Sequence, residues 1–235
     1  MDEPLALTIG VTKSYSVPGG QAVQVLTAVH CQVQPGDRIA LVGPSGSGKS
    51  TLLHILAGLI EPTSGSIRWP ALGPRDQLMP VKVQAVFQAP SLFPALNVRD
   101  NITLPLLLAG VGAPTAALAD QLLDRFGLTE LALKLPEELS GGQAQRVAML
   151  RALAVSPRLI LADEPTGQLD TATGQAFLTL VIEMVRASGA ALLIATHDPA
   201  VAARMDRQWS IDHGTLWPDS PPQPMPATAD TAGTS

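Results

Sequence analysis

The stretch that most constrains this chain is residues 43–51, which read G-P-S-G-S-G-K-S-T. It follows a short apolar run at 39–42 and precedes an apolar helical stretch at 52–57. The order is therefore strand, glycine-rich loop, helix, and the loop matches the template G-x-x-x-x-G-K-[ST] at every fixed position. An ordinary Gly/Ser turn is the alternative, but context and spacing together favour a phosphate-binding loop.

Each residue type in this loop suits a triphosphate. Gly46 and Gly48 let the backbone curl tightly, because a Cβ there would crowd the phosphates. The helix that begins near Gly48 directs the positive end of its dipole at the same oxygens. Lys49 can reach the β- and γ-phosphates, and the Ser50 hydroxyl can bind Mg²⁺. The predicted ATP contacts in the loop are Gly43, Pro44, Ser45, Gly46, Ser47, Gly48, Lys49, Ser50 and Thr51.

Composition limits the partners of the chain. Its 235 residues are enough for one large domain or two small ones, and 46% of them are apolar. The net charge of −5 argues against an extended nucleic-acid surface, which would need a basic stripe, so we expect no nucleic-acid partner. The single cysteine, Cys31, excludes an intrachain disulfide and suits a reducing cytosol.

Membrane segments are not expected. The opening Met-Asp-Glu-Pro has no basic region before an apolar one, so the sequence predicts no signal peptide. The most apolar long stretch, 102–119, is broken by two prolines and two glycines, so we expect no transmembrane helix. A role at a membrane would require docking onto a partner that spans it.

Apolar runs at 39–42, 83–87, 158–162 and 190–195 alternate with helical stretches, which favours a parallel sheet covered on both faces. Near the N-terminus, alternating residues at 5–11, one or two strands at 23–33 and a short strand before residue 69 indicate an antiparallel layer. Residues 97–155 read as helical, with Asn97 as a helix cap and Pro105 expected to limit or kink the first helix. A second helix is expected at about 114–126.

The C-terminal stretch 218–235 has a different composition. It contains five prolines in eighteen residues and shows no apolar periodicity. We expect it to be a disordered tail.

An apolar strand at 159–162 ends in Asp163 and Glu164. Asp163 can hold the Mg²⁺ shell, and Glu164 can point toward a water in line with the γ-phosphate. A general base in that place contributes about 10²–10⁴ in rate. Alone, Asp-Glu after a strand is more typical of a solvated loop; the phosphate-binding loop upstream favours the catalytic interpretation.

Residues 139–143 read L-S-G-G-Q and open a second helix. Ser140 is a suitable N-cap, and Gly141 and Gly142 expose backbone N–H groups beside it, so this is a second anion-binding helix end. One triphosphate does not obviously need two such ends in one chain. L-S-G-G-Q is the hallmark of the ATP-binding cassette family, which the chain resembles over roughly residues 4–217.

The resemblance implies a site shared by two cassettes that face each other head to tail. The signature of one, Ser140, Gly141, Gly142 and Gln143, would close on the ATP held by the phosphate-binding loop of the other. Two further residues match positions that contact the nucleotide: Tyr15 matches the aromatic residue that stacks on adenine, and His197 matches the switch histidine near the γ-phosphate. Gln88 matches the glutamine that contacts Mg²⁺ and senses the membrane partner. Asp170 lies in the loop that crosses the dimer interface. A turn aromatic and a structural histidine are the alternatives for Tyr15 and His197. The implied catalytic residues are Glu164, His197 and Lys49, and the implied Mg²⁺ ligands are Ser50, Gln88 and Asp163.

The sequence around Gln88, together with Asn97, Asn101 and residues 105–110 and 136–139, looks like the bacterial lipoprotein-releasing, macrolide-exporting and cell-division subgroup. Two departures leave the subgroup and the substrate open. The segment 70–84 is short and has only Arg75 and Lys82 as basic residues, and Gln168 stands where the subgroup more often has asparagine.

The resemblance thus implies an α/β fold: a P-loop NTPase (RecA-like) core with an antiparallel β subdomain and an inserted helical subdomain. We expect a nucleotide-binding domain at 1–217, with the helical subdomain at about 89–157. The implied function is an ATP-binding and ATP-hydrolysing subunit that dimerises on ATP and couples to a permease, for export or lipoprotein release. It would sit on the cytoplasmic face of the bacterial inner membrane.

The groove beside residues 88–96 is the expected docking place for a permease helix. Leu92 and Phe93 are candidate contacts there, although burial within the cassette itself is an equal alternative.

Two other functions use the same motifs. One is a cassette that moves no solute and transmits force to a membrane complex, which only the partner distinguishes. The other is a soluble ATPase of the DNA-repair or translation type. The DNA-repair type would need a long coiled-coil insertion, and the translation type would need two cassettes in one chain. Neither fits in 235 residues.

Overall fold

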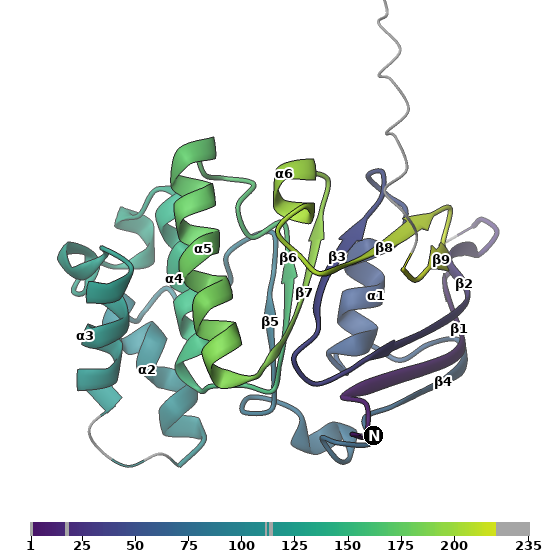
Figure 1. The fold of residues 1–235 in the computed structure, drawn as a ribbon, viewed down its shortest axis with the longest axis horizontal. Coiled ribbons are helices and arrows are strands. Elements are labelled where there is room, and N and C mark those ends of the chain that lie inside the picture. The colour runs from purple at the N-terminus through teal and green to yellow at the C-terminus, as the bar shows by residue number, and fades with distance from the viewer. Residues whose placement is uncertain (1, 17–18, 111, 113–114, 220–235) are drawn as a thin grey trace, which may run out of the picture.

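The computed structural model describes residues 2–16, 19–110, 112 and 115–219, which form two β-sheets with helices on both faces of the larger one (Figure 1). The strands are β1 (Ala6–Tyr15), β2 (Val23–Val33), β3 (Arg38–Val42), β4 (Ser64–Arg68), β5 (Val83–Val86), β6 (Leu159–Asp163), β7 (Ala191–Thr196), β8 (Arg207–Asp212) and β9 (Thr215–Trp217). The helices are α1 (Lys49–Leu56), α2 (Val98–Leu108), α3 (Thr115–Arg125), α4 (Gly141–Ala154), α5 (Thr171–Ser188) and α6 (Pro199–Ala202), with short 3₁₀ turns η1 (Arg75–Gln77), η2 (Thr129–Leu131) and η3 (Pro136–Glu138).

The larger sheet has the order β5-β6-β7-β3-β8-β9. Its neighbouring strands run parallel except β8 and β9, which pair antiparallel. Every residue of β6 and β7 is buried, as expected for parallel strands covered on both faces. The predicted fold class is confirmed.

Successive residues of each central strand face two different apolar cores. In β6, Ile160 and Ala162 belong to the core formed with α2 to α6, whereas Leu159 and Leu161 belong to the core formed with α1 and the smaller sheet. Helices α1 and α4 therefore lie on opposite faces of the parallel sheet.

The smaller sheet has the order β2-β1-β4, and both of its pairs are antiparallel. Residues 23–33 form one strand. Its pairing with β1 shifts register three times, and Ala28 has a φ of 45°, the mark of a bulge that bends a long strand without ending it.

The first inserted helix, α2, begins after Asn97 as predicted and runs through Pro105, where the sequence predicts a limit or a kink. The Asn97 side chain caps it by accepting a hydrogen bond from the Asp100 N–H at 2.8 Å. The helix continues three residues past Pro105, so the proline does not terminate it. Ile102 and Leu106 are buried, and their packing keeps the last turn helical despite the missing N–H.

The inserted helical segment carries no membrane span. In the described ranges, no helix is both long enough and apolar enough to cross a bilayer.

The described chain continues past β9 to Asp219, which is tied back to the larger sheet. The Asp219 carboxylate accepts hydrogen bonds from Nε and Nη2 of Arg207, both at 2.7 Å. Arg207 also donates to Asp37 at 2.6 Å, so it ties the chain after β9 to the turn before β3. Most of the predicted tail, residues 220–235, lies outside the described residues.

Asp219→Asn is expected to lower the free energy of unfolding at pH 7 by up to about 1 kcal/mol, because the pair is half exposed. The hydrogen bonds from Arg207 hold the pKa of Asp219 below its ordinary value. A lowered carboxyl pKa gives stability that is present above about pH 3.9 and is lost as the pH falls through the folded-state pKa. Urea unfolding of the wild type and the variant at several pH values measures the difference, with the exposed Asp124→Asn as control. If the difference in unfolding free energy between wild type and variant does not shrink in acid, the Arg207–Asp219 pair does not stabilise the protein as expected.

Candidate nucleotide-binding site

The phosphate-binding loop joins β3 to α1 and depends on glycine at two kinds of position. Gly46 and Gly48 have φ values of 78° and 108°, in the left-handed region that favours glycine. At Gly43 the reason is clearance, because a Cβ would lie 2.1 Å from the backbone oxygen of Ile211 in β8. Gly43 therefore supplies clearance, whereas Gly46 and Gly48 supply backbone conformations that a side chain would strain.

Gly43→Ala is expected to weaken ATP binding at least about tenfold and to lower the melting temperature, because β3 and β8 would have to separate locally. Isothermal titration with ATP and thermal melts measure both effects. Gly112→Ala is the matched control, since a Cβ there meets nothing within 4 Å. A Gly43→Ala chain that binds ATP as the wild type does would contradict the need for clearance between residue 43 and Ile211.

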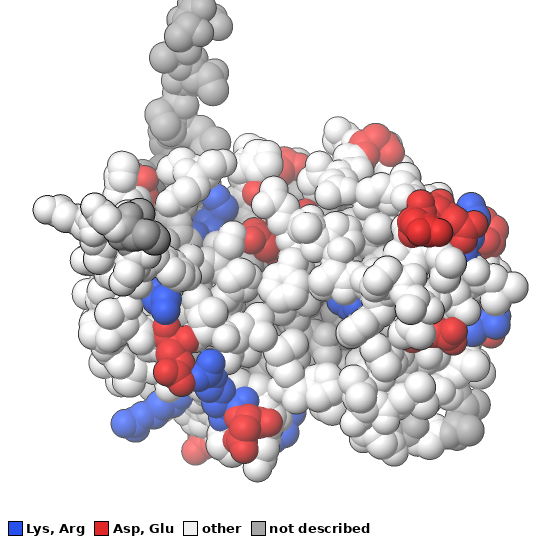
Figure 2. Space-filling view, turned by 180° about the vertical axis from the view of Figure 1, so that it is seen from behind, with Lys and Arg blue, Asp and Glu red and all other residues white. Residues whose placement is uncertain are grey.

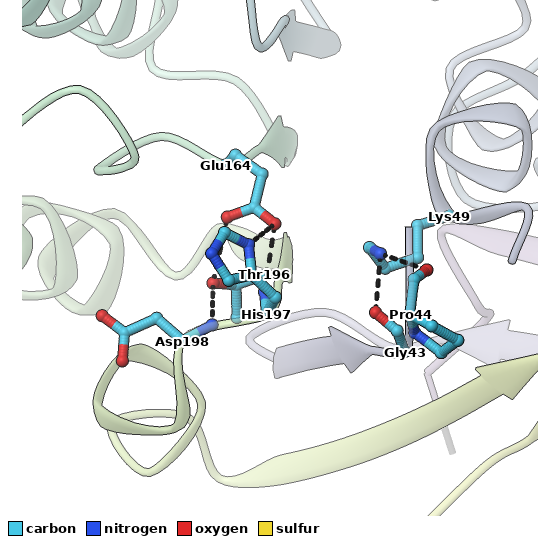
Figure 3. Close-up of polar contacts among 7 residues, drawn as sticks. All are labelled: Gly43, Pro44, Lys49, Glu164, Thr196, His197 and Asp198. Carbon is cyan, nitrogen blue, oxygen red and sulfur yellow. Dashed lines mark hydrogen bonds and ion pairs between the residues drawn. The ribbon is translucent and has the colours of Figure 1, made fainter. Parts of the chain in front are cut away.

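Lys49 is held inside the loop. Its Nζ donates to the backbone oxygens of Gly43 at 2.8 Å and Pro44 at 3.0 Å, and the side chain is buried (Figure 3). Burial lowers the pKa of Lys49, while the nearby Glu164 and Asp163 carboxylates act in the opposite direction. The ammonium is thus held against the loop backbone, within the electrostatic influence of the two acidic residues.

The loop fits a polyphosphate on its own features. Helix α1 starts at Gly48 with no side-chain cap, which leaves its first N–H groups available to an anion. The buried Ser47 Oγ has no hydrogen-bond partner within the described residues, so a polar group is left for a ligand.

Glu164 and His197 are brought into direct contact. Strands β6 and β7 are neighbours, with Asp163 opposite Ala195, so the residues that follow them meet at one edge of the sheet. The Glu164 Oε1 accepts hydrogen bonds from the His197 N–H at 3.0 Å and Nδ1 at 2.7 Å (Figure 3). Thr196 Oγ1 donates to Oε2 at 3.3 Å. Three contacts therefore fix the carboxylate, and Glu164 holds a φ of 48° while making them.

The sequence interpretation missed Thr196 as a partner of Glu164. The place of Thr196 directly before His197 can be read from the sequence, but the adjacency of β7 to the strand that carries Glu164 is a property of the fold.

The three predicted magnesium ligands all carry oxygen donors, as Mg²⁺ prefers. Asp163 is buried at the end of β6, Ser50 is exposed in the first turn of α1, and Gln88 is exposed two residues beyond β5. In the part of the chain that the structure describes, no three His, Cys, Asp or Glu side chains gather as a metal site. This donor set fits a Mg²⁺ that keeps several phosphate or water ligands.

The signature helix α4 opens with a reciprocal cap. Ser140 Oγ accepts from the Gln143 N–H at 3.2 Å, and the Gln143 side chain accepts from the Ser140 N–H at 2.9 Å. The predicted N-cap is confirmed, and the role of Gln143 in it is additional to the prediction.

The signature glycines also pack against the loop at 167–169 of the same chain. A Cβ on Gly141 would lie 2.0 Å from the Gln168 side-chain oxygen, and one on Gly142 would lie 2.8 Å from its backbone oxygen. Asp170 then caps α5 by accepting from the Thr173 N–H at 3.0 Å. Hydrogen bonding by the Thr173 side chain, and then by its N–H, lowers the pKa of Asp170. The signature and the loop of the predicted dimer interface therefore form one surface.

The predicted residues do not all meet in one chain. The phosphate-binding loop, Asp163, Glu164 and His197 gather at one sheet edge, whereas the signature begins a helix on the opposite face from α1.

Tyr15 ends β1. The residue is 42% exposed, and the Lys13 Nζ lies 5.1 Å from the centroid of its ring. This exposure leaves Tyr15 free to stack on a flat ligand.

A groove of about 460 Å³ lies beside the segment that carries Gln88. Its lining includes Met79, Phe87, Leu92, Phe93, Leu108 and Arg151. Phe93 is 49% exposed, so it presents an apolar surface, whereas Leu92 packs partly against the core.

Comparisons with known proteins agree with this geometry. A family model described as ABC transporter matches residues 26–167. The chain is 43% identical over 225 residues to the lipoprotein-releasing system ATP-binding protein LolD of Hyphomonas neptunium, covering 92% of this chain and 98% of that protein. It is 43% identical over 214 residues to LolD 1 of Rhodospirillum rubrum, covering 88% and 94%.

Solved structures give the same picture. The dimeric cassette MJ0796, in a post-hydrolysis state bound to ADP and Pi, superposes with a TM-score of 0.83 at 34% identity. The match covers 90% of this chain and 96% of that one.

Proposed function

The chain belongs to the ABC transporter family as an ATP-hydrolysing subunit, and on that premise we propose that it drives a lipoprotein-releasing permease at the cytoplasmic face of the bacterial inner membrane. Relatives named as lipoprotein-releasing ATP-binding proteins, each matched over nearly their whole length, support this choice over macrolide export or cell division. The similarity to these relatives also outweighs the two departures from the subgroup's sequence pattern, the short segment 70–84 and Gln168.

In the proposed site, the loop at 43–51 holds the phosphates and Tyr15 stacks on the adenine. Lys49 exchanges its two backbone acceptors for β- and γ-phosphate oxygens. A Mg²⁺ held by Ser50, Gln88 and Asp163 would neutralise charge that develops on the phosphates.

Hydrolysis is assigned to the Glu164–His197 pair. Glu164 takes a proton from the attacking water as the water oxygen bonds to the γ-phosphorus and the bond to ADP breaks. His197 and Thr196 orient the carboxylate for this step. His197 Nδ1 is engaged with Glu164, which leaves Nε2 as the ring nitrogen that can face the γ-phosphate.

The single observation that carries the dimer is the placement of the two anion-binding helix ends on opposite faces of one sheet. In the proposed arrangement, the signature of one copy meets ATP held by the loop of the other. The dimeric cassettes at 34% identity support a head-to-tail pair. We propose that ATP closes this pair and hydrolysis opens it.

The charge pattern favours a protein partner over nucleic acid. On the face shown in Figure 2, blue and red residues are interspersed and large areas are uncharged, with no continuous basic stripe. The apolar groove beside Phe93 is the proposed seat of the permease helix.

The test is capture of the partner from the host. Tagged Glu164→Gln chain with Mg-ATP is incubated with detergent-solubilised membranes, and bound proteins are identified by mass spectrometry. We expect a permease with few spans and a large extracytoplasmic domain, and we expect Phe93→Asp in the same bait to lose it.

Two results would contradict the proposal. A many-span permease recovered with a solute-binding protein would replace lipoprotein release by import. A bait shown to be dimeric and ATP-loaded, yet without any membrane partner, would remove the transporter role.

A further inference from the structure

The segment 87–93, which carries Gln88 and one rim of the groove, is attached to the signature helix at two points. The first is Gln145 of α4, which is fully buried. Its Nε2 donates to the backbone oxygen of Phe87 at 3.2 Å. Phe87 directly precedes Gln88, so this hydrogen bond holds the N-terminal side of the segment.

The second attachment is Arg151, two turns further along α4. Its Nη1 donates to the backbone oxygen of Ser91 at 2.7 Å, and its Nη2 contacts Ser91 Oγ at 3.1 Å. The guanidinium also lies over the Phe93 ring, 5.8 Å from the centroid. Burial lowers the pKa of Arg151, and in the described ranges no carboxylate forms an ion pair with it. A partly buried cation that binds only this segment is suited to hold it in place.

We propose that Gln145 and Arg151 are positioning residues that fasten the segment carrying Gln88 to the signature helix, so that the two move as one body. The inference rests on the proposed function, in which Ser140 at the start of α4 contacts the ATP of the other copy. Arg151 lies eleven residues after Ser140, or about 16 Å along the helix. A displacement of the groove rim would therefore be carried to the signature through a single rigid element.

One atom of this connection is unsatisfied. The buried Oε1 of Gln145 has no hydrogen-bond partner among the described residues. An unpaired buried acceptor is costly, and a side chain that only filled this space would not carry it. The buried amide is therefore best explained by the hydrogen bond that its Nε2 donates to the Phe87 oxygen.

The experiment separates catalysis from nucleotide binding. Gln145→Met and Arg151→Met are made singly and together in the full chain, and steady-state ATPase kinetics, ATP affinity and melting temperature are measured. We expect each variant to lower kcat about tenfold, because loss of a buried or charged hydrogen bond misplaces the signature. ATP affinity should stay within about twofold, since one chain binds ATP through its own loop. Arg151→Lys, which keeps one donor for the Ser91 carbonyl, should recover part of kcat.

Arg125→Met on α3 is the matched control, because within the described residues the one ion pair of Arg125 is a 3.6 Å contact with Glu183 at the surface. If kcat stays within about twofold of wild type in the double variant, Gln145 and Arg151 do not position the signature. If kcat, ATP affinity and melting temperature fall together and Arg151→Lys restores nothing, the residues are merely structural.

The same variants in the Glu164→Gln background test the link to the dimer. We expect weaker ATP-dependent dimerisation than in Glu164→Gln alone. A Glu164→Gln parent that forms no dimer would overturn the proposed function itself, whereas a parent that dimerises and variants that dimerise equally well would overturn only this inference.

Discussion

Glu164→Gln is expected to reduce ATP turnover at least about 10²-fold while ATP binding persists and an ATP-loaded dimer accumulates. The amide keeps the size of the side chain and can still accept the hydrogen bond from the His197 N–H, so the loop geometry should survive. It cannot take a proton from water. Phosphate release measures turnover, equilibrium dialysis measures ATP binding, and light scattering on a sizing column measures dimerisation.

Glu183→Gln provides the control for this variant, because Glu183 lies on α5 and its only recorded contact in the described structure is the long pair with Arg125. Wild-type turnover in Glu164→Gln would remove Glu164 from the role of base. Loss of ATP binding in the same variant would instead show that the carboxylate shapes the nucleotide site.

Ser140→Arg is expected to block hydrolysis with little change in ATP affinity. Ser140 is exposed at the start of α4, where a long cation would obstruct the nucleotide of the other copy. Loss of the cap alone should cost about 1 kcal/mol of stability, which Ser140→Ala reports separately.

Mixing two inactive chains gives a sharper form of this test. A Ser140→Arg chain keeps its phosphate-binding loop, and a Lys49→Ala chain keeps its signature, so one intact composite site forms in each mixed dimer. We expect the mixture to recover part of the activity that neither chain has alone. Activity in Ser140→Arg alone, or none in the mixture when mixed dimers are shown to form, would contradict the head-to-tail arrangement.

Much of the fold could be predicted because its signals are local. The parallel strands are continuous apolar runs, the loop at 43–51 is punctuated by glycines, and Asn97 and Ser140 cap helices through residues only three positions away. Where tertiary packing decides, the sequence leaves alternatives open. Pro105 is expected to limit or kink its helix, and α2 continues past it because Ile102 and Leu106 bury against the core. Residues 23–33 could form one strand or two, and β2 stays one strand by bulging at Ala28.

The same distinction applies to the candidate site. The types of residue and their order along the chain could be read from motifs, but their contacts depend on which strands are neighbours. Thr196 meets Glu164 only because β7 lies beside β6, and Gln145 and Arg151 reach the Gln88 segment across about sixty residues of sequence. No periodicity in the sequence reports such pairings.

The pairing of β3 has a consequence for the synthesis of the protein. The phosphate-binding loop lies early in the chain, yet β3 is flanked by β7 and β8, and Gly43 abuts Ile211. The loop therefore lacks its neighbouring strand β8 until residue 212 has been synthesised. We expect a chain that ends before β8 to bind ATP more weakly than the full chain, because Gly43 would have no strand to pack against. Synthesis of the C-terminal strands thus completes a site whose sequence lies near the start of the chain.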